Sequence, residues 1–423
     1  MAELLDGPTD DARRQRADTA LVNLFGSPEG LEDPTRFTSV LRQEAPVHVS
    51  AFGGVVFSRY DDCRAILRDD RFGNGNRPNQ SFGAGSPEAT AYRLEMIERR
   101  RDRPLSMLAL DPPDHTRQRS LVNRAFTPRR IEEMRDRIAA LADRYLDQLA
   151  EAGTGDAMEL LALPLPVSVI SAMLGVPDRD WPEIRSLVTD LVLSLEPAAT
   201  VDDLKRSETA GDALWAYFDD LAGHRRARPA DDLLTDLLAA EERDDRLSHG
   251  EVLAVSVLLF AAGAETTTNL IGNGLAALFT HPDQQARLWA DPALVPTAVE
   301  EILRFDSPVQ IDGRTALEPI EACGVRFEAG DRLLTLLGAA NRDPDHFDEP
   351  DRFDVGRHGE AVMSFGSGIH YCLGANLARA EAQEVFAAMI RRFSAVEPAG
   401  DRPRQRRMIL RGLQTCPVRV TPR

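Results

Sequence analysis

The longest helical segment of this sequence runs from Gly250 to Thr280, and its length constrains any fold that contains it. Ser248 and Glu251 form an S-x-x-E capping box at its start, and His281-Pro282 ends it. At 1.5 Å per residue the helix would be about 45 Å long, which is enough to cross a whole domain. Its middle is apolar on almost every side, so we predict a buried central helix around which the other elements pack.

Shorter elements are predicted on both sides of this segment. Before it, apolar residues recur at helical spacing from about 131 to 242, with prolines between the helices. After Phe305 the pattern changes to short strands with turns, and a helix returns over 374–393. No repeat or linker divides the chain. We therefore predict one mainly α domain (α+β) with small β-sheets over residues 1–423, in which segment 1–45 is packed or partly ordered.

Charge and cysteine content restrict the partners and the compartment. The 50 basic and 68 acidic residues give a net charge of -18, which argues against binding to nucleic acid or an anionic membrane. The longest apolar run, Val252–Ala264, is shorter than the ~20 residues of a membrane span, and no signal peptide is visible. Four cysteines without CxxC spacing are too few for a disulfide scaffold. These features predict a cytoplasmic protein without a membrane or nucleic-acid partner.

The stretch Phe365-Gly-Ser-Gly-Ile-His-Tyr-Cys-Leu-Gly374 carries the most specific chemistry. Its glycines let the backbone turn tightly around a bulky group. Cys372 lies just before a predicted helix, where free N–H groups and the positive end of the helix dipole favour a thiolate. Such a thiolate is a metal ligand or a nucleophile, and the alternative is a small buried cysteine in a glycine-rich turn.

This decamer resembles the haem-binding signature of the cytochrome P450 family, F-G-x-G-x-H-x-C-x-G, at every fixed position. The resemblance implies a mostly helical fold with small sheets around a buried haem b (iron protoporphyrin IX). It makes Cys372 the axial iron ligand and places Phe365 and Gly366 against the haem. A thiolate ligand favours cleavage of the O–O bond, so O₂ is the implied co-substrate.

A second family match is Glu301-Ile-Leu-Arg304, which fits the E-x-x-R helix. Glu301 and Arg304 share one helix face, and a buried carboxylate needs such a partner to stay ionised. The resemblance implies that Arg352, in Pro350-Asp-Arg-Phe353, completes this pair. The implied role is a structural lock on the cysteine loop.

A third match is Ala262-Gly-Ala-Glu-Thr-Thr267, in the middle of the long helix. A helix-interior glycine costs ~1 kcal/mol and a buried glutamate costs more, so stability does not explain this sequence. Thr266 can donate a hydrogen bond to the carbonyl of Ala262 and open the helix locally. The resemblance implies a groove for O₂ at Ala262, with Glu265 and Thr266 as a catalytic proton relay.

The resemblance also assigns residues to the two haem propionates. His115 and Arg119 lie one helical turn apart, and Arg314 and His370 match the other two propionate partners. Hydrogen bonds from arginine and histidine to a carboxylate are of the strong, charge-assisted kind.

The chain has no flavin or phosphate-loop motif, so its electrons must come from other proteins. The resemblance implies a ferredoxin and a ferredoxin reductase, with NAD(P)H as the indirect donor. Six arginines are predicted to form the docking patch: Arg117, Arg124, Arg129, Arg130, Arg357 and Arg379.

The substrate pocket is predicted above the haem, with an apolar lining that suits a lipophilic small molecule. A steroid, fatty acid, terpene or polyketide-type metabolite would fit equally well, with hydroxylation or epoxidation as the reaction. The Gly- and Pro-rich segment 72–87 is either a functional loop, such as an entry lid, or disordered. The lining residues expected are Phe82, Leu108, Val188, Leu258, Ala261, Val309, Ile311 and Leu413.

Three functions remain open at this point. The first is an O₂-dependent monooxygenase. The second is a haem-thiolate peroxygenase or rearrangement enzyme, which often lacks the acid–alcohol pair that Glu265 and Thr266 provide. The third is a non-catalytic haem sensor, which gains nothing from a proton relay. We therefore expect the monooxygenase.

Overall fold

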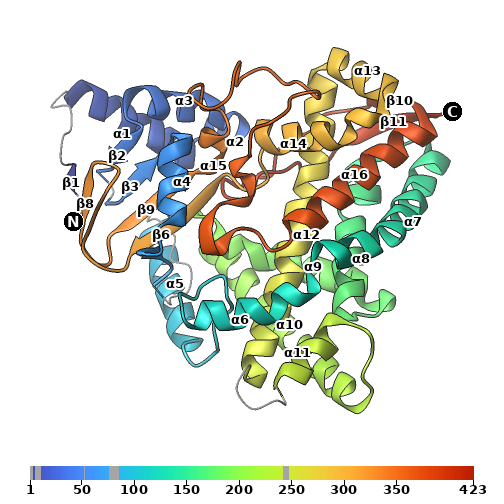
Figure 1. Ribbon diagram of the computed structural model, residues 1–423, viewed down its shortest axis with the longest axis horizontal. Coiled ribbons are helices and arrows are strands. Elements are labelled where there is room, and N and C mark those ends of the chain that lie inside the picture. The colour runs from blue at the N-terminus through green and yellow to red at the C-terminus, as the bar shows by residue number, and fades with distance from the viewer. Residues whose placement is uncertain (1–2, 5–10, 52, 76–84, 242–246) are drawn as a thin grey trace.

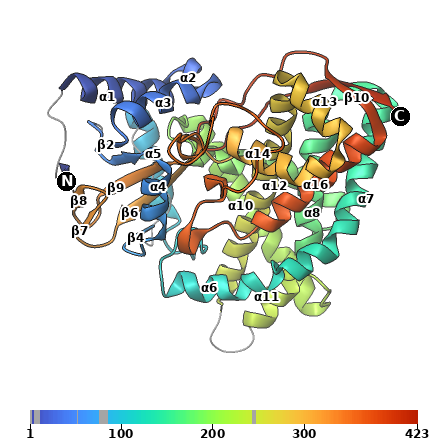
Figure 2. The same cartoon turned by 45° about the horizontal axis from the view of Figure 1, so that its top comes forward.

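The computed structural model describes residues 3–4, 11–51, 53–75, 85–241 and 247–423. It consists mainly of helices packed around α12 (His249–Thr280), with most strands on the side of the N-terminus and β10 near the C-terminus on the other side (Figures 1 and 2). The other helices of eight or more residues are α1 (Asp11–Gly26), α3 (Pro34–Glu44), α4 (Tyr60–Arg68), α5 (Pro87–Arg99), α6 (Asp114–Val122), α7 (Pro128–Ala152), α8 (Pro164–Leu174), α9 (Trp181–Leu191), α10 (Val201–Ala227), α11 (Leu233–Glu241), α13 (Pro282–Ala290), α14 (Val295–Phe305) and α16 (Ala375–Arg392). Short helices are α2 (Pro28–Glu32) and α15 (Leu337–Ala340).

The central helix α12 is the one that the sequence predicts. The Ser248 hydroxyl accepts a hydrogen bond from the Glu251 amide, and the Glu251 carboxylate accepts one from the Ser248 amide. Most of its residues are buried, and α8, α10, α14 and α16 surround it (Figures 1 and 2). In the part of the chain that the structure describes, α12 alone is long and apolar enough to cross a membrane, and this is also the character of a core helix.

Three small sheets complete the fold. The largest has the strand order β2-β3-β9-β6-β4, in which β3 and β9 are parallel and the other pairs are antiparallel. Residues 46–58 form the hairpin of its antiparallel pair β2 and β3. The other sheets have the orders β10-β11-β5 and β1-β8-β7. The strands are β1 (Glu3–Leu4), β2 (Val47–Val49), β3 (Val55–Phe57), β4 (Phe72–Gly73), β5 (Thr154–Asp156), β6 (Ile311–Ala316), β7 (Ile320–Ala322), β8 (Val325–Phe327), β9 (Arg332–Leu336), β10 (Phe393–Pro398) and β11 (Pro417–Pro422).

The N-terminal helices pack on the largest sheet. Leu21 and Leu24 of α1 and Leu41 of α3 are buried in one apolar cluster with Val56 of β3 and Leu334 of β9. The described residues of segment 11–45 are thus joined to the rest of the fold by a shared apolar core.

Candidate functional site

The loop that contains Cys372 is held by close backbone contacts. In Figures 1 and 2 it passes between α4 and α12 before it enters α16. The Cys372 amide donates to the carbonyl of Phe365 over 2.9 Å. Gly368 has a φ of 73°, and a Cβ added there would lie 2.0 Å from the Leu67 carbonyl oxygen of α4. Only glycine allows the loop to approach α4 this closely.

The residue Cys372 has solvent-accessible surface, and surrounding protein atoms desolvate its thiol. Burial of the thiol by surrounding protein raises its pKa, while the Gly374 amide, Arg119 and Arg379 lower it. The expected thiolate therefore stays a prediction. α16 begins only at Ala375, and desolvation opposes the thiolate in the protein without a metal ion. A coordinated metal ion would deprotonate such a thiol.

The middle of α12 has an exposed face. Ala262 is exposed, although Ala261 and Ala264 on the same helix are buried. The Thr266 hydroxyl donates to the Ala262 carbonyl over 2.8 Å, which confirms the predicted local hydrogen bond. Gly263 packs against Ile170 of α8, where an added Cβ would lie 3.2 Å from that side chain. The small residues 262–264 therefore serve close packing on one side and leave accessible surface on the other.

Glu265 is buried, as the sequence predicts, and it forms an ion pair that the sequence analysis did not predict. Its side chain is 4% exposed, and Arg407 Nη1 lies 2.6 Å from its Oε1. Burial raises the pKa of Glu265, and Arg407 and a hydrogen bond from Gln405 oppose this rise. Arg407 also donates to the carbonyl of Thr189 at the end of α9. Arg407 lies 142 residues from Glu265 along the chain, and no motif marks it.

His115, Arg119, Arg314 and His370, which the sequence assigns to the propionates, come together. The rings of His115 and His370 are 4.3 Å apart, centroid to centroid. Burial and the charge of Arg314 lower the pKa of His370 to about 3. Burial and the charge of Arg119 also lower the pKa of His115. These lowered pKa values mean that the cluster, which we call the cation cluster, disfavours further positive charge. Its two cations are Arg119 and Arg314, and Arg314 also pairs with Asp312.

The cation cluster passes a test for a haem site. Both ring nitrogens of His115 are buried and have no hydrogen-bond partner among the described residues. A buried polar atom without a partner costs about 1–3 kcal/mol, so a partner of complementary chemistry is expected there. Carboxylates supply hydrogen-bond acceptors and negative charge together. The donor set therefore fits two propionates, with Cys372 and the exposed face at Ala262 available to the rest of the porphyrin.

Glu301 and Arg304 form a fully buried, bidentate ion pair. Arg304 Nε and Nη2 lie 2.7 and 2.8 Å from the two Glu301 oxygens. The guanidinium also donates to the carbonyls of Asn341, Pro350 and Arg352, which satisfies its remaining N–H groups. The Asn341 side chain in turn bonds the Met363 amide and the Ser364 hydroxyl, directly before the cysteine loop.

The predicted partner role of the Arg352 side chain is wrong. Its guanidinium is half exposed and pairs with Glu349, and only its backbone carbonyl contacts Arg304. Instead, Arg357 Nε lies 3.1 Å from Glu301 Oε2. The P-x-R-F sequence therefore contributes a backbone acceptor, and an arginine five residues later supplies the charge.

Most of the predicted docking arginines are also neutralised by acids. Arg117 pairs with Glu251 and Asp114, Arg129 with Glu133, Arg130 with Asp236, Arg357 with Glu301, and Arg379 with Glu300. Arg124 is exposed, and no ion pair of its side chain occurs within the described ranges.

The predicted pocket residues differ in how much of their surface is exposed. Leu108 is 54% exposed, and Leu258 and Val309 are partly exposed, so each offers apolar surface. Val188, Ile311 and Leu413 are at most 6% exposed and belong to apolar clusters, and their role as lining residues stays a prediction. Ala261 is 8% exposed, and Phe82 lies outside the described residues.

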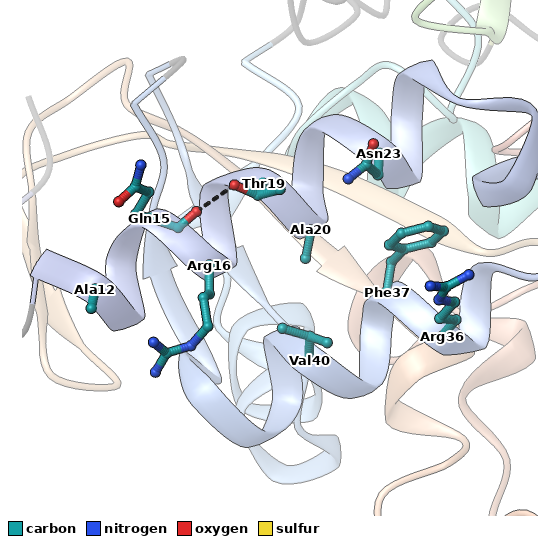
Figure 3. A pocket seen from close by; sticks show the side chains of 9 residues that line it. All are labelled: Ala12, Gln15, Arg16, Thr19, Ala20, Asn23, Arg36, Phe37 and Val40. Carbon is teal, nitrogen blue, oxygen red and sulfur yellow. Dashed lines mark hydrogen bonds between the residues drawn. The ribbon is translucent and has the colours of Figure 1, made fainter.

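A separate groove of about 520 Å³ lies between α1 and α3 (Figure 3). Figure 3 shows that polar side chains such as Gln15 and Asn23 of α1 and apolar ones such as Phe37 and Val40 of α3 line it. Its lining includes no cysteine, histidine or carboxylate and no predicted site residue. It therefore offers no groups for the chemistry considered above.

Comparisons with known proteins agree with this geometry. The family model "Cytochrome P450" matches residues 88–417. Cytochrome P450 107B1 of Saccharopolyspora erythraea is 40% identical over 390 residues, which cover 90% of this chain and 93% of that protein. The vitamin D(3) 25-hydroxylase of Pseudonocardia autotrophica is also 40% identical, over 93% of this chain and 95% of its own. The crystal structure of the myxobacterial cytochrome P450 CYP267B1 with myristic acid gives a TM-score of 0.85 at 37% identity, covering 94% and 98% of the two chains.

These matches extend over almost the full length of both chains and confirm the expected fold class. The chain belongs to the cytochrome P450 family, and it is a monooxygenase that carries haem on a cysteine thiolate, uses O₂ and receives electrons from NAD(P)H through partner proteins.

Proposed function

We propose that this enzyme hydroxylates or epoxidises a lipophilic small molecule, with Cys372 as the iron ligand. The observation that carries the proposal is the pairing of two features. One is the accessible Cys372 loop, and the other is the accessible face of α12 that bears Ala262 and Thr266. In this arrangement the cation cluster holds the propionates, and Phe365, Gly366 and Ala262 contact the porphyrin. When bound, the haem activates O₂ and transfers one oxygen atom to the substrate.

The proton relay is assigned to two neighbouring side chains. The Thr266 hydroxyl gives its hydrogen to the Ala262 carbonyl, so its oxygen lone pairs remain free to accept a hydrogen bond. Burial raises the pKa of Glu265, and a raised pKa favours the protonated carboxyl that a general acid needs. Oε1 of Glu265 is held by Arg407, so Oε2 is the atom that we assign to proton transfer.

Replacing Thr266 with alanine tests this relay. We expect Thr266→Ala to lower the product formed per NAD(P)H by about tenfold or more, with peroxide released instead, because a positioned proton donor contributes roughly 10²–10⁴-fold to a rate. Haem content should stay unchanged. Thr268→Ala is the matched control, since Thr268 makes the same bond one turn back, to Ala264, but is buried. Unchanged product per NAD(P)H in Thr266→Ala would rule out the relay.

The lipophilic substrate is supported by the accessible apolar side chains of Leu108, Leu258 and Val309. The names of two relatives also indicate lipophilic molecules. One hydroxylates vitamin D(3), and one was crystallised with myristic acid. A steroid, fatty acid, terpene or polyketide-type metabolite therefore remains the substrate class that we propose.

We propose that residues 1–423 form one domain and that the enzyme lies in the cytoplasm. We assign electron delivery to a ferredoxin and its reductase. Because acids neutralise five of the six predicted docking arginines, we expect a shallow salt dependence, in which electron transfer slows by less than about tenfold as ionic strength rises from about 0.01 to about 0.1 M. Stopped-flow reduction by ferredoxin measures this rate.

Arg124 is the one arginine of this set for which we expect a large individual effect. Arg124→Glu should raise the KM for ferredoxin, because it reverses an exposed charge next to α6. Arg36→Glu on α3 is the control on a distant element, and it should leave the KM unchanged. Equal effects of both variants would place the docking surface elsewhere.

A further inference from the structure

We propose that Asn74 is a positioning residue of the haem site, which orients His370 so that its Nδ1–H group is the one available to a propionate. Asn74 lies in the Gly- and Pro-rich segment 72–87, directly after strand β4. The inference rests on the proposed role of the cation cluster and deepens it, because it assigns the ring nitrogen of His370 that carries the hydrogen.

The backbone holds Asn74 beside the cation cluster. β4 pairs antiparallel with β6, the strand that contains Arg314. The Asn74 and Gly75 amides donate to the two carboxylate oxygens of Asp111 over 2.7 and 2.6 Å. A Cβ added at Gly73 would lie 2.2 Å from Asp111 Oδ1, so only glycine permits this close contact. Asp111 thus fixes the backbone from which the Asn74 side chain extends.

The side-chain amide of Asn74 has one orientation that its contacts allow. Its Nδ2 lies 2.7 Å from the carbonyl oxygen of Leu108 and 3.3 Å from Nε2 of His370. A backbone carbonyl can only accept a hydrogen bond, so the atom that faces Leu108 must be the NH₂ nitrogen and not the amide oxygen. This nitrogen has two hydrogens, and one of them is left for His370.

The contact with Asn74 determines the tautomer of His370. An amide nitrogen donates hydrogen bonds and does not accept them, so Nε2 of the ring must be the acceptor and carries no hydrogen. The hydrogen of the imidazole is then on Nδ1, because the hydrogen bond of one ring nitrogen sets the state of the other. Within the described residues, the His370 ring makes this one hydrogen bond. Nδ1 therefore remains a donor for a carboxylate.

The other tautomer of His370 would oppose haem binding. A bare Nδ1 would present a lone pair to a propionate oxygen, and two acceptors repel each other. Without Asn74 the ring would also be free to turn, since the neighbouring His115 ring, 4.3 Å away, forms no hydrogen bond with it. Asn74 therefore preorganises the donor, so that haem binding does not have to reorient it.

Nitrogen nuclear magnetic resonance of the haem-loaded enzyme tests the tautomer directly. The enzyme is isotope-labelled at its histidines, reduced and bound to carbon monoxide, which makes the iron diamagnetic. The chain has 8 histidines, so the ring signals of His370 can be assigned by their absence in His370→Ala. We expect a hydrogen on Nδ1 and a bare Nε2. A hydrogen on Nε2 of the wild-type enzyme would overturn the proposal.

A double-mutant cycle tests whether Asn74 acts through His370. Asn74→Leu keeps a similar shape without the donor, and the readout is the rate at which haem transfers to an excess of apomyoglobin. Loss of the hydrogen bond that orients a metal-binding histidine typically weakens binding about 10- to 100-fold, so we expect haem to leave Asn74→Leu about tenfold faster. In the His370→Ala background, the same substitution should have no further effect.

The dimethyl ester of haem separates positioning from a merely structural role. It has no propionate carboxylates, so Asn74→Leu should not change the rate at which this haem leaves the protein. Asn123→Leu, at an exposed asparagine after α6, is the matched control and should leave both rates as in the wild type. If Asn74→Leu does not fold, Asn74→Ala removes the same donor with a smaller side chain.

The outcomes distinguish two failures. An additive effect in the His370→Ala background, or an equal effect on haem and its ester, would overturn positioning through His370. Unchanged haem release in His370→Ala would instead overturn the proposed propionate role of His370.

Discussion

Replacing Cys372 with alanine is expected to abolish substrate turnover and the strongly red-shifted Soret band of the reduced carbon monoxide complex. The band depends on a thiolate opposite carbon monoxide, and alanine offers no ligand in its place. The cation cluster and the face at Ala262 remain in this variant, so a porphyrin can still bind there with altered ligation. Absorption spectra of the reduced, carbon monoxide-treated protein measure the outcome.

A second cysteine provides the control. Cys323 is partly exposed and hydrogen-bonds to Asp62, and it precedes the short strand β8. Cys323→Ser should leave both the band and the turnover as in the wild type. Survival of the band in Cys372→Ala would exclude Cys372 as the ligand.

Replacing Arg304 with leucine should destabilise the fold by about 3–5 kcal/mol, because it removes one partner of a fully buried ion pair. Glu301 would keep the contact with Arg357 and the hydrogen bond from the Asp354 amide, and the carbonyls of Asn341 and Pro350 would lose their donor. Since Asn341 holds Met363 and Ser364, we also expect the cysteine loop to loosen and haem to be lost more readily.

The matched control distinguishes the two arginines near this pair. Arg352→Ala should change the free energy of unfolding by less than about 0.5 kcal/mol, because its side chain is half exposed and its carbonyl is unaffected. Urea unfolding of the haem-loaded variants measures both values. Equal destabilisation by Arg304→Leu and Arg352→Ala would mean that the Arg352 side chain is part of the lock after all.

The sequence predicts the elements of this fold well, because their signals are local. The capping box at Ser248, the hairpin of β2 and β3 and the Thr266–Ala262 bond all depend on residues a few positions apart. Contacts between segments that are distant in the sequence have no such local signal. Nothing local indicates that Arg407 pairs with Glu265, or that Arg357 rather than Arg352 lies against Glu301. Such pairs depend on how loops cross in three dimensions.

Burial is the other quantity that a motif does not contain. A cysteine before a helix favours a thiolate if the helix end dominates, but here desolvation raises the pKa of Cys372. Likewise, Ile311 and Leu413 are predicted lining residues, and the sequence did not show that both are buried in apolar clusters of the protein. The sequence pattern identifies which residues are apolar, and the packing of the fold decides whether these residues contact a ligand.

The cation cluster leads us to expect that the abundance of this protein in a cell depends on porphyrin supply. His115, Arg119, Arg314 and His370 repel additional positive charge, and the ring nitrogens of His115 are unsatisfied within the protein. A ligand that binds only the folded chain stabilises it by mass action, so each rise in free haem increases the folded fraction. Under iron starvation more of the newly made polypeptide would be unfolded and open to proteases. The oxygenase level would then follow iron status without any dedicated regulator.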